Sequence, residues 1–261
     1  MSGFGMTSRN FSELDTNEIS REAAKRTLRL LPAKTLKSGK YAVVIDREVA
    51  SELLSLLGSY FSAKAVDENK SIFKEKLGKS IAASNVTLVD DPTFLSGSAF
   101  HPFDAEGEVS NKTILIDKGI LKNYLTNLEY SLKMNLPHTA SAARSPASEM
   151  EISCSNLIFE KGNKSREELL KIHNQVIYLT ELDGFHSGFN HSTGDFSLPG
   201  QGFLYASGQM LYPVDQFIVS GNILVLLENI KEIGNEYNPP GSRVAVSDLL
   251  ISELFFAGDK T

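Results

Sequence analysis

Residues 48–61 read EVASELLSLLGSYF and directly follow the apolar run Tyr41–Ile45. Apolar residues of this stretch fall at i, i+4, i+7, i+8 and i+11, at Val49, Leu53, Leu56, Leu57 and Tyr60. That spacing is typical of one buried face of a helix. The sequence therefore predicts a strand over 40–46 that leads into a helix over 48–61. The predicted helix contains no histidine and no cysteine, so it carries no obvious catalytic chemistry.

The chain before this pair predicts a loop or arm over 1–14, followed by another helix. Asp15 with Glu18 resembles a capping box, an apolar stripe follows, and Pro32 ends the helix. The N-terminal portion is therefore expected to run helix–strand–helix. A further short helix is expected over 71–78, where a glycine would end it.

The rest of the chain is rich in strand-like runs. Hairpins are expected at the Lys-Gly pair between Thr113–Asp117 and Ile120–Leu125, and at Ser207–Gly208. Other strand-like runs lie at 86–90, 153–159, 175–182, 202–206, 209–214 and 243–256. Two further helices are expected to start near Ser165 and Ile223. Successive strands with few helices among them predict an α+β fold with a mostly antiparallel, barrel-like sheet. The lack of repeats and low-complexity linkers favours a single domain over 1–261.

Composition and charge restrict the class of protein. Of the 261 residues, 41% are hydrophobic and 22% are charged, which is ordinary for a soluble globular domain. A net charge of −6 argues against direct nucleic-acid binding, because such binding needs a basic face. No apolar run is long enough to span a membrane, and residues 1–10 lack the apolar core of a signal peptide. A cytoplasmic location is therefore expected.

The single cysteine and the acidic stretches offer little chemistry. Cys154 excludes an internal disulfide and a multi-cysteine zinc site, and its apolar neighbours predict a buried, inert thiol on a strand. Asp90 and Asp91 could form a carboxylate pair for acid–base catalysis, although acids commonly close a strand before a proline. The acids of His101–Glu108 do not match a calcium-binding loop and predict a solvated turn.

His186, His191 and Asp195 form the stretch that most resembles a metal site. Neighbouring glycines argue against a helix, so a loop would have to bring the ligands together. The alternative is a glycine-rich turn with polar side chains. The chain contains no Walker loop, no dinucleotide-binding fingerprint and no Gly-x-Ser-x-Gly elbow. The residues by themselves therefore indicate an α+β domain without a visible catalyst.

Several stretches together resemble the C-terminal half of the TldD/PmbA proteins, a zinc metallopeptidase family also named modulator of DNA gyrase. These stretches are Gly78–Ser84, Asp90–Pro92, Pro102–Gly107, Thr113–Leu125, Ser192–Ser197, Ser207–Val214 and Val219–Asn222. Their order and spacing follow the family over essentially the whole chain. Leu136–Arg144 departs from it, because the family usually has a Thr-Gly-Asn-like turn there. The family's N-terminal domain is expected to be absent.

The resemblance implies a vacated metal site on the predicted helix. TldD-like proteins carry His-Glu-x-x-x-His on this helix and a cysteine further along as the third zinc ligand. The corresponding positions here are Leu54, Ser55 and Ser59, and no cysteine follows Cys154. These side chains cannot replace the imidazoles that bind zinc or the glutamate that polarises water. The chain is therefore similar to the PmbA (TldE) branch, and zinc is expected only in a TldD-like partner.

The resemblance thus implies a non-catalytic subunit of a TldD/TldE-type metalloprotease complex that acts in the proteolysis or maturation of flexible peptides. The expected partners are a TldD-like zinc peptidase or a second copy of the chain, and a peptide substrate, without direct contact to nucleic acid or membrane. Whether the chain is itself an enzyme stays open. One alternative is an active metallopeptidase with relocated ligands at His186, His191 and Asp195. Another is a homodimeric peptide-binding or regulatory module of the gyrase-modulator type.

Overall fold

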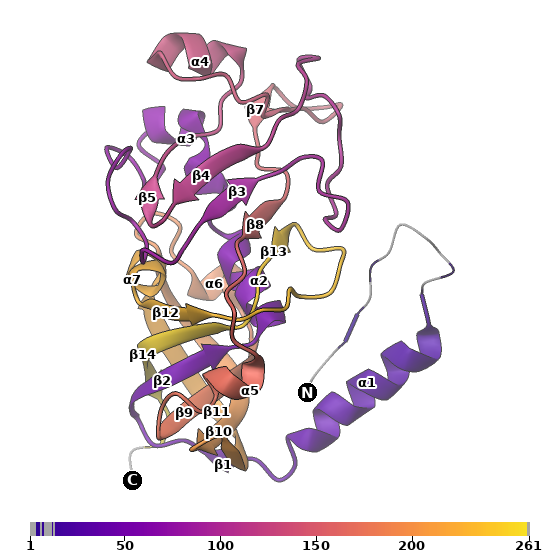
Figure 1. Ribbon diagram of the computed structural model, residues 1–261, viewed down its shortest axis with the longest axis vertical. Helices are drawn as coiled ribbons and strands as arrows, with labels where there is room; N and C mark the ends of the chain where they lie inside the picture. The colour runs from indigo at the N-terminus through magenta and orange to yellow at the C-terminus, as the bar shows by residue number, and fades with distance from the viewer. Residues whose placement is uncertain (1–3, 6, 8–11, 13, 260–261) are drawn as a thin grey trace. The chain divides into compact units, whose positions relative to one another are not determined.

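The computed structural model describes residues 4–5, 7, 12 and 14–259 (Figure 1). These residues form two compact units. The barrel unit contains the described residues up to Ala50 together with Lys161–Gly241 and those from Val246 onward. The loop-rich unit contains Ser51–Glu160 and Ser242–Ala245. The single domain expected over 1–261 stays a prediction.

The barrel unit is built on a seven-stranded sheet with the order β1-β11-β10-β9-β2-β14-β12. Its strands are β1 (Lys34–Thr35), β2 (Gly39–Ile45), β9 (Gln175–Leu182), β10 (Asp195–Ala206), β11 (Gln209–Asn222), β12 (Ile230–Ile233) and β14 (Leu249–Ala257). An additional pairing of β11 with β14 closes five of them, β11-β10-β9-β2-β14, into a barrel. Only β1–β11 and β2–β9 pair in parallel. The α+β class with a mostly antiparallel, barrel-like sheet is thereby confirmed.

Strand β9 contains a continuous run of apolar residues, because both of its faces are covered. Residues Val176–Leu179 are all buried, although successive side chains of a strand point to opposite faces. Tyr178 belongs to a cluster with Val44, Phe203 and the α5 residue Leu169. Both faces of β9 are therefore covered, and its predicted bounds of 175–182 are confirmed.

The β10–β11 hairpin turns where it was predicted. Ser207 and Gly208 have φ values of 49° and 78°, the left-handed conformation that two-residue hairpin turns require. Both strands extend beyond the predicted runs over 202–206 and 209–214. For β10 the prediction was too short because Pro199 and two glycines interrupt its apolar pattern. Its first half nevertheless alternates between buried and exposed residues.

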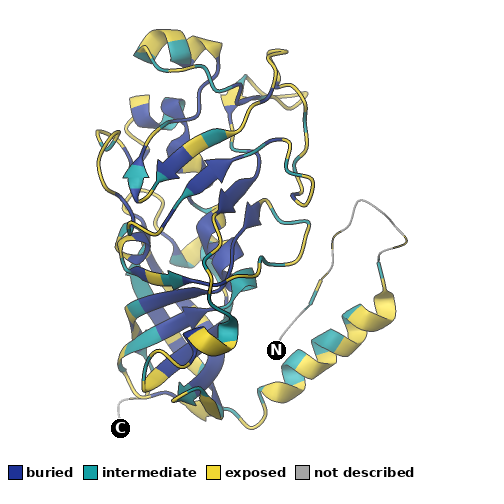
Figure 2. Cartoon of the chain, viewed as in Figure 1, coloured by how far each residue is buried: buried dark blue, intermediate teal, exposed yellow. Residues whose placement is uncertain are grey.

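Side-chain caps begin most helices of the barrel unit. Helix α1 (Thr16–Arg29) is capped by Asp15, α5 (Arg166–Leu169) by a capping box of Ser165 and Glu168, and α7 (Ile223–Glu228) by Asn222. The short α6 (Phe185–Gly188) follows Gly184 without a side-chain cap. These starts confirm the helices expected near Asp15, Ser165 and Ile223. No residue of α1 is buried, as its colours in Figure 2 show.

The loop-rich unit contains a five-stranded sheet with the order β13-β8-β3-β4-β5 and a two-stranded pair. The elements are β3 (Leu88–Asp90), β4 (Thr113–Asp117), β5 (Ile120–Leu121), β8 (Leu157–Phe159), β13 (Val244–Ala245), β6 (Ala142–Ala143), β7 (Glu151–Ile152), α3 (Ala63–Asp67) and α4 (Leu128–Met134). The predicted hairpin turn is present, with φ values of 48° at Lys118 and 81° at Gly119. The run 153–159 is only partly a strand, because residues 153–156 pair with no strand.

The helix expected over 71–78 is wrong. These residues form turns, since Ser71 Oγ donates to Tyr60 O and accepts from Phe73 N at 3.1 Å. Glu75 has a φ of 60°, which an α-helix excludes. Local side-chain bonds of this kind compete with helix formation.

The stretch 48–61 forms two helical pieces and not the one predicted helix. Helix α2 (Arg47–Ser55) tightens at its end, where Leu57 N donates to Leu54 O at 3.1 Å, and a 3₁₀ segment, η2 (Gly58–Phe61), follows. A Cβ at Gly58 would lie 2.5 Å from Cys154 Sγ, so this close approach requires glycine. The predicted apolar face is nevertheless buried, as shown by Leu53, Leu57 and Tyr60.

No helix in the described part of the chain is long and apolar enough to cross a membrane.

Candidate functional site

The positions at which the family resemblance places the zinc motif hold no donor set for a metal. Leu54 is fully buried in the apolar core. Ser55 is exposed and its Oγ donates to Glu52 O at 2.6 Å, while the exposed Ser59 donates to Leu56 O at 3.5 Å. Leu54 has no atom that can bind a metal, and the two serine hydroxyls are engaged by backbone carbonyl oxygens three residues earlier. These residues therefore do not fit zinc.

A cavity of about 360 Å³ lies in the loop-rich unit, and Cys154, which contacts the backbone of η2, is part of its wall. Its lining comes from three stretches and one residue of the segment 242–245, namely Ala99, His101, Phe103, Asp104, Ala105, Ser141, Ala142, Ala143, Arg144, Ser153, Cys154, Ser155 and Arg243. Four of these residues are alanines, whose short side chains fill little of the space. The cavity is therefore shaped by backbone and short side chains, with a few charged groups among them.

Helix α2 and strand β8 hold the segment that carries Arg243. Ser51 Oγ donates to Val244 O at 2.9 Å and lies 2.7 Å from Ser242 Oγ. Leu157 N donates to Arg243 O at 2.8 Å. The backbone on both sides of Arg243 is thus tied down, while its side chain stays exposed.

Asn156 organises the loop that supplies Ala99 to the cavity wall. This side chain is only 1% exposed. Its Nδ2 donates to Asp91 O at 2.8 Å and to Ala99 O, and its Oδ1 accepts from Ala99 N at 3.1 Å. A buried amide of this kind supplies the partners that a loop backbone would otherwise lack.

Asp90 lies behind the cavity wall and closes strand β3. Its Oδ1 accepts from both Ser155 N and Ser155 Oγ, each at 2.8 Å. Burial raises the pKa of Asp90 to about 6, and the bonds from Ser155 oppose that shift. Asp91 Oδ1 instead accepts from Thr93 N at 2.9 Å. The two acids therefore have separate structural partners, as acids that close a strand do.

Cys154 lies between β7 and β8, so the expectation that it lies on a strand is wrong. Burial raises the pKa of its thiol to about 11, the charge of Asp90 adds to this rise, and Arg243 opposes it. A thiol with such a pKa is almost entirely protonated at neutral pH, which makes it a poor nucleophile. The predicted inert character is thus consistent with its surroundings.

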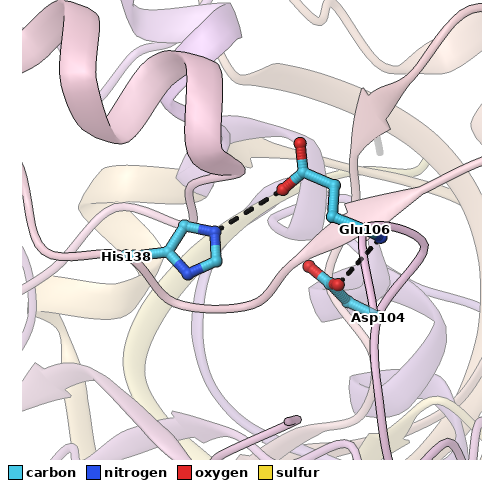
Figure 3. Close-up of side chains that lie close together, drawn as sticks. All are labelled: Asp104, Glu106 and His138. Atoms are coloured by element: carbon cyan, nitrogen blue, oxygen red, sulfur yellow. Dashed lines mark hydrogen bonds and ion pairs between the residues drawn. The ribbon is translucent and has the colours of Figure 1, made fainter. Parts of the chain in front are cut away.

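Asp104, Glu106 and His138 lie side by side next to the cavity (Figure 3). Among the described residues they are the group of three metal-capable side chains whose ligand atoms all lie within 4.8 Å of one another. Asp104, in the stretch expected to be a solvated turn, is instead 6% exposed. His138 Nε2 lies 3.5 Å from Glu106 Oε2. This sequence-distant group was not foreseen, because 32 residues separate Glu106 from His138.

His186, His191 and Asp195 are all exposed and do not form such a group. Asp195 already accepts bonds from Asn222 Nδ2 at 2.8 Å and from Thr193 Oγ1 at 2.6 Å. These bonds lower the pKa of Asp195 and hold the loop that precedes β10. The structure thus gives Asp195 a role in holding a turn.

A second cavity, of about 260 Å³, lies in the barrel unit, and many of its charges are paired within its wall. Arg26 donates to both oxygens of Glu48 at 2.7 and 2.8 Å. Arg166 bonds to Asp46 at 2.9 Å and to Asp248 at 2.8 Å. The other bases of this wall are engaged as well, since Lys25 pairs with Glu22, Arg47 pairs with Glu236, and Arg29 lies 5.2 Å from the centre of the Phe203 ring. Because its cations already have partners within the protein, we take the cavity of the loop-rich unit as the candidate site.

The closed five-stranded barrel and the loop-rich unit define the class, an α+β protein with a mostly antiparallel sheet, and positions 54, 55 and 59 hold no zinc ligands. Residues 38–258 match the model of the PmbA/TldA metallopeptidase C-terminal domain, and the chain therefore belongs to this family.

Relatives named as metalloproteases match most of this chain but only about half of their own length. Metalloprotease PmbA of Escherichia coli O157:H7 is 30% identical over 96% of this chain and 53% of its own. A metalloprotease of Methanothermobacter thermautotrophicus is 28% identical over 85% of this chain and 49% of its own. What the full-length relatives do is therefore carried over only as a proposal.

Solved structures share the fold. A proposed modulator of a DNA gyrase from Thermotoga maritima has a TM-score of 0.88 and 31% identity, covering 96% of this chain and 57% of its own. TldE from Thermococcus kodakarensis has a TM-score of 0.83 and 21% identity, covering 94% of this chain and 56% of its own. At that identity the second likeness shows the fold alone.

Proposed function

We propose that this chain is the non-catalytic, peptide-holding member of a TldD/TldE-type metalloprotease complex, and that its TldD-like partner carries the zinc. The observation that supports this most strongly is the nature of Leu54, Ser55 and Ser59. Leu54 is buried in the core, and the hydroxyls of Ser55 and Ser59 donate to the carbonyl oxygens of the residues three positions earlier. Peptide hydrolysis by a zinc enzyme needs a metal-bound water, and these three positions in α2 and η2 supply no ligand for that metal.

The cavity beside η2 supports a holding role. Its walls are formed by exposed loops and short side chains, and the thiol within it is held protonated. Such a surface can bind a flexible chain without cutting it. The negative net charge of −6 does not favour direct action on DNA. We propose that the protein acts in proteolysis in the cytoplasm.

The first test measures metal content and peptide cleavage by the purified chain. We expect substoichiometric zinc and no chelator-sensitive cleavage of unfolded peptides. Stoichiometric zinc together with such cleavage would overturn the proposal. A His186→Ala/His191→Ala variant is measured alongside, because loss of metal in it would instead support a peptidase with relocated ligands.

The second test asks which partner binds. The tagged chain is recovered from its native cells, and co-purified proteins are examined for a relative that carries His-Glu-x-x-x-His. Recovery of that relative, and gain of cleavage when the two are mixed, is the expected result. A homodimer by light scattering, without such a relative and without cleavage, would favour the regulatory module over the heterodimer.

A further inference from the structure

Two arginines in the wall of the candidate cavity have no acidic partner. Arg144 and Arg243 both line the cavity and both are exposed. In the part of the chain that the structure describes, no ion pair engages either guanidinium. Arg26 and Arg166 in the barrel unit, by contrast, bond to carboxylates at 2.7–2.9 Å. The cavity therefore presents positive charge that the protein itself does not neutralise.

The one carboxylate in the wall is already occupied. Asp104 is 6% exposed. Its Oδ1 accepts from Glu106 N at 2.9 Å and Glu108 N at 3.0 Å, and its Oδ2 accepts from Ala142 N at 3.1 Å. Three backbone donors stabilise this charge where it stands, so Asp104 serves to fold the loop and to join it to β6. Because Asp104 bonds to these backbone groups, the two arginines stay available to a ligand.

The remaining wall defines what lies beside the charge. Ala99, Ala105 and Ala142 leave space, and the Cys154 thiol is held protonated and uncharged. Phe103 lines the same cavity with 61% of its surface exposed. An apolar group next to the ligand's charge would cover this ring and gain by its burial.

We propose that this cavity recognises a carboxylate of the peptide, with Arg144 and Arg243 as its cationic contacts and Phe103 as the seat of a neighbouring apolar side chain. Guanidinium groups suit this task, because their planar fork matches the two oxygens of a carboxylate. The inference rests on the proposed peptide-holding function and adds a substrate class to it. The carboxylate belongs either to an acidic side chain or to the end of the peptide.

Three labelled peptides separate these sources in a fluorescence-anisotropy titration of the purified chain. One contains Phe-Glu in its middle and an amidated end, the second has Phe-Gln and an amidated end, and the third has Phe-Gln and a free carboxylate. We expect one of the two acidic peptides to bind about tenfold more tightly than the neutral one, as charge-assisted hydrogen bonds permit. The acidic peptide that gains affinity identifies the source.

Arg144→Gln and Arg243→Gln, each confirmed as folded by circular dichroism, should abolish this preference while leaving binding of the neutral peptide unchanged. Arg21→Gln is the matched control, because it removes an exposed arginine outside the cavity. Equal binding of all three peptides, or a preference that survives both cavity substitutions, would overturn the carboxylate inference alone. Failure of every peptide to bind would overturn the peptide-holding function, and this inference with it.

Discussion

In the barrel unit the backbone pairs mainly along five closed strands, whereas in the loop-rich unit buried polar side chains do much of this pairing. Thirteen polar or charged residues are buried in the described part of the chain, and only Ser247 and Asp248 of these lie in the barrel unit. The loop-rich unit contains the others, among them Asp90, Asp104 and Asn156. Loops without ladder partners need such groups, because an unpaired buried amide or carbonyl is costly.

This difference explains where the candidate site lies. A closed barrel satisfies its own edges and fills its interior with apolar side chains. Loops held by single side chains can instead leave a hollow and orient charged groups around it. The cavity with Arg144 and Arg243 occurs in the second kind of structure.

The largest expected effect comes from the barrel interior. Phe217 is 1% exposed and meets the Phe256 ring edge-on at 5.1 Å between centroids. Phe217→Ala should lower the free energy of unfolding by about 4 kcal/mol, since it leaves a cavity in a packed core. Urea unfolding followed by circular dichroism measures this. Phe255→Ala is the control, because Phe255 is 44% exposed and its removal should cost about 1 kcal/mol. Similar losses for the two variants would show that the barrel is not packed as described.

The second effect tests the buried charge of the loop-rich unit through pH. The folded-state pKa of Asp90, about 6, lies above its ordinary value of 3.8, so the folded protein holds a proton that the unfolded chain has released. Stability should therefore fall as pH rises between these two values, by roughly 3 kcal/mol relative to an Asp90→Asn variant. Urea unfolding of both proteins across this range gives the difference. A difference independent of pH would contradict the raised pKa.

The smallest effect concerns the side-chain amide of Asn156, which bonds to loop backbone groups that no strand pairs. Asn156→Ala removes bonds to Asp91 O and to both backbone groups of Ala99, and should cost about 2 kcal/mol. Hydrogen exchange at the Ala99 amide should accelerate at the same time. Asn111→Ala, which removes an exposed side-chain bond to Val109 O, serves as control and should change little. Unchanged exchange at Ala99 would show that the loop is held by other contacts.

Local chemistry made several elements predictable. The turns at Lys118–Gly119 and Ser207–Gly208 follow from their glycines, which tolerate positive φ, and the caps at Asp15, Ser165 and Asn222 follow from their short polar side chains. The helix expected over 48–61 ends at Ser55, and a 3₁₀ segment begins at Gly58, whose close approach to Cys154, far away in the chain, requires glycine.

The candidate site was less predictable than the fold. Cys154 and Asp90 were singled out from the sequence, and Asp104 was considered only as one acid of the stretch His101–Glu108. No role was expected for Arg144, Arg243 and Asn156. Each of these three is unremarkable among its sequence neighbours, and each acquires a role only through distant partners. Arg243 reaches the cavity because its segment pairs with β8. Asn156 holds the loop of the cavity wall because its side chain bonds to Ala99, 57 residues away in the chain.

By itself, the sequence determined the turns, the caps, the strand β9 and the absence of metal-binding side chains at 54, 55 and 59, because these depend on residue type and on near neighbours. Only the tertiary structure decided that β11 meets β14 to close the barrel, that Gly58 lies close against Cys154, and that Arg144 and Arg243 line one cavity. Those outcomes depend on contacts between segments far apart in the chain. Such contacts leave no periodic trace in either segment.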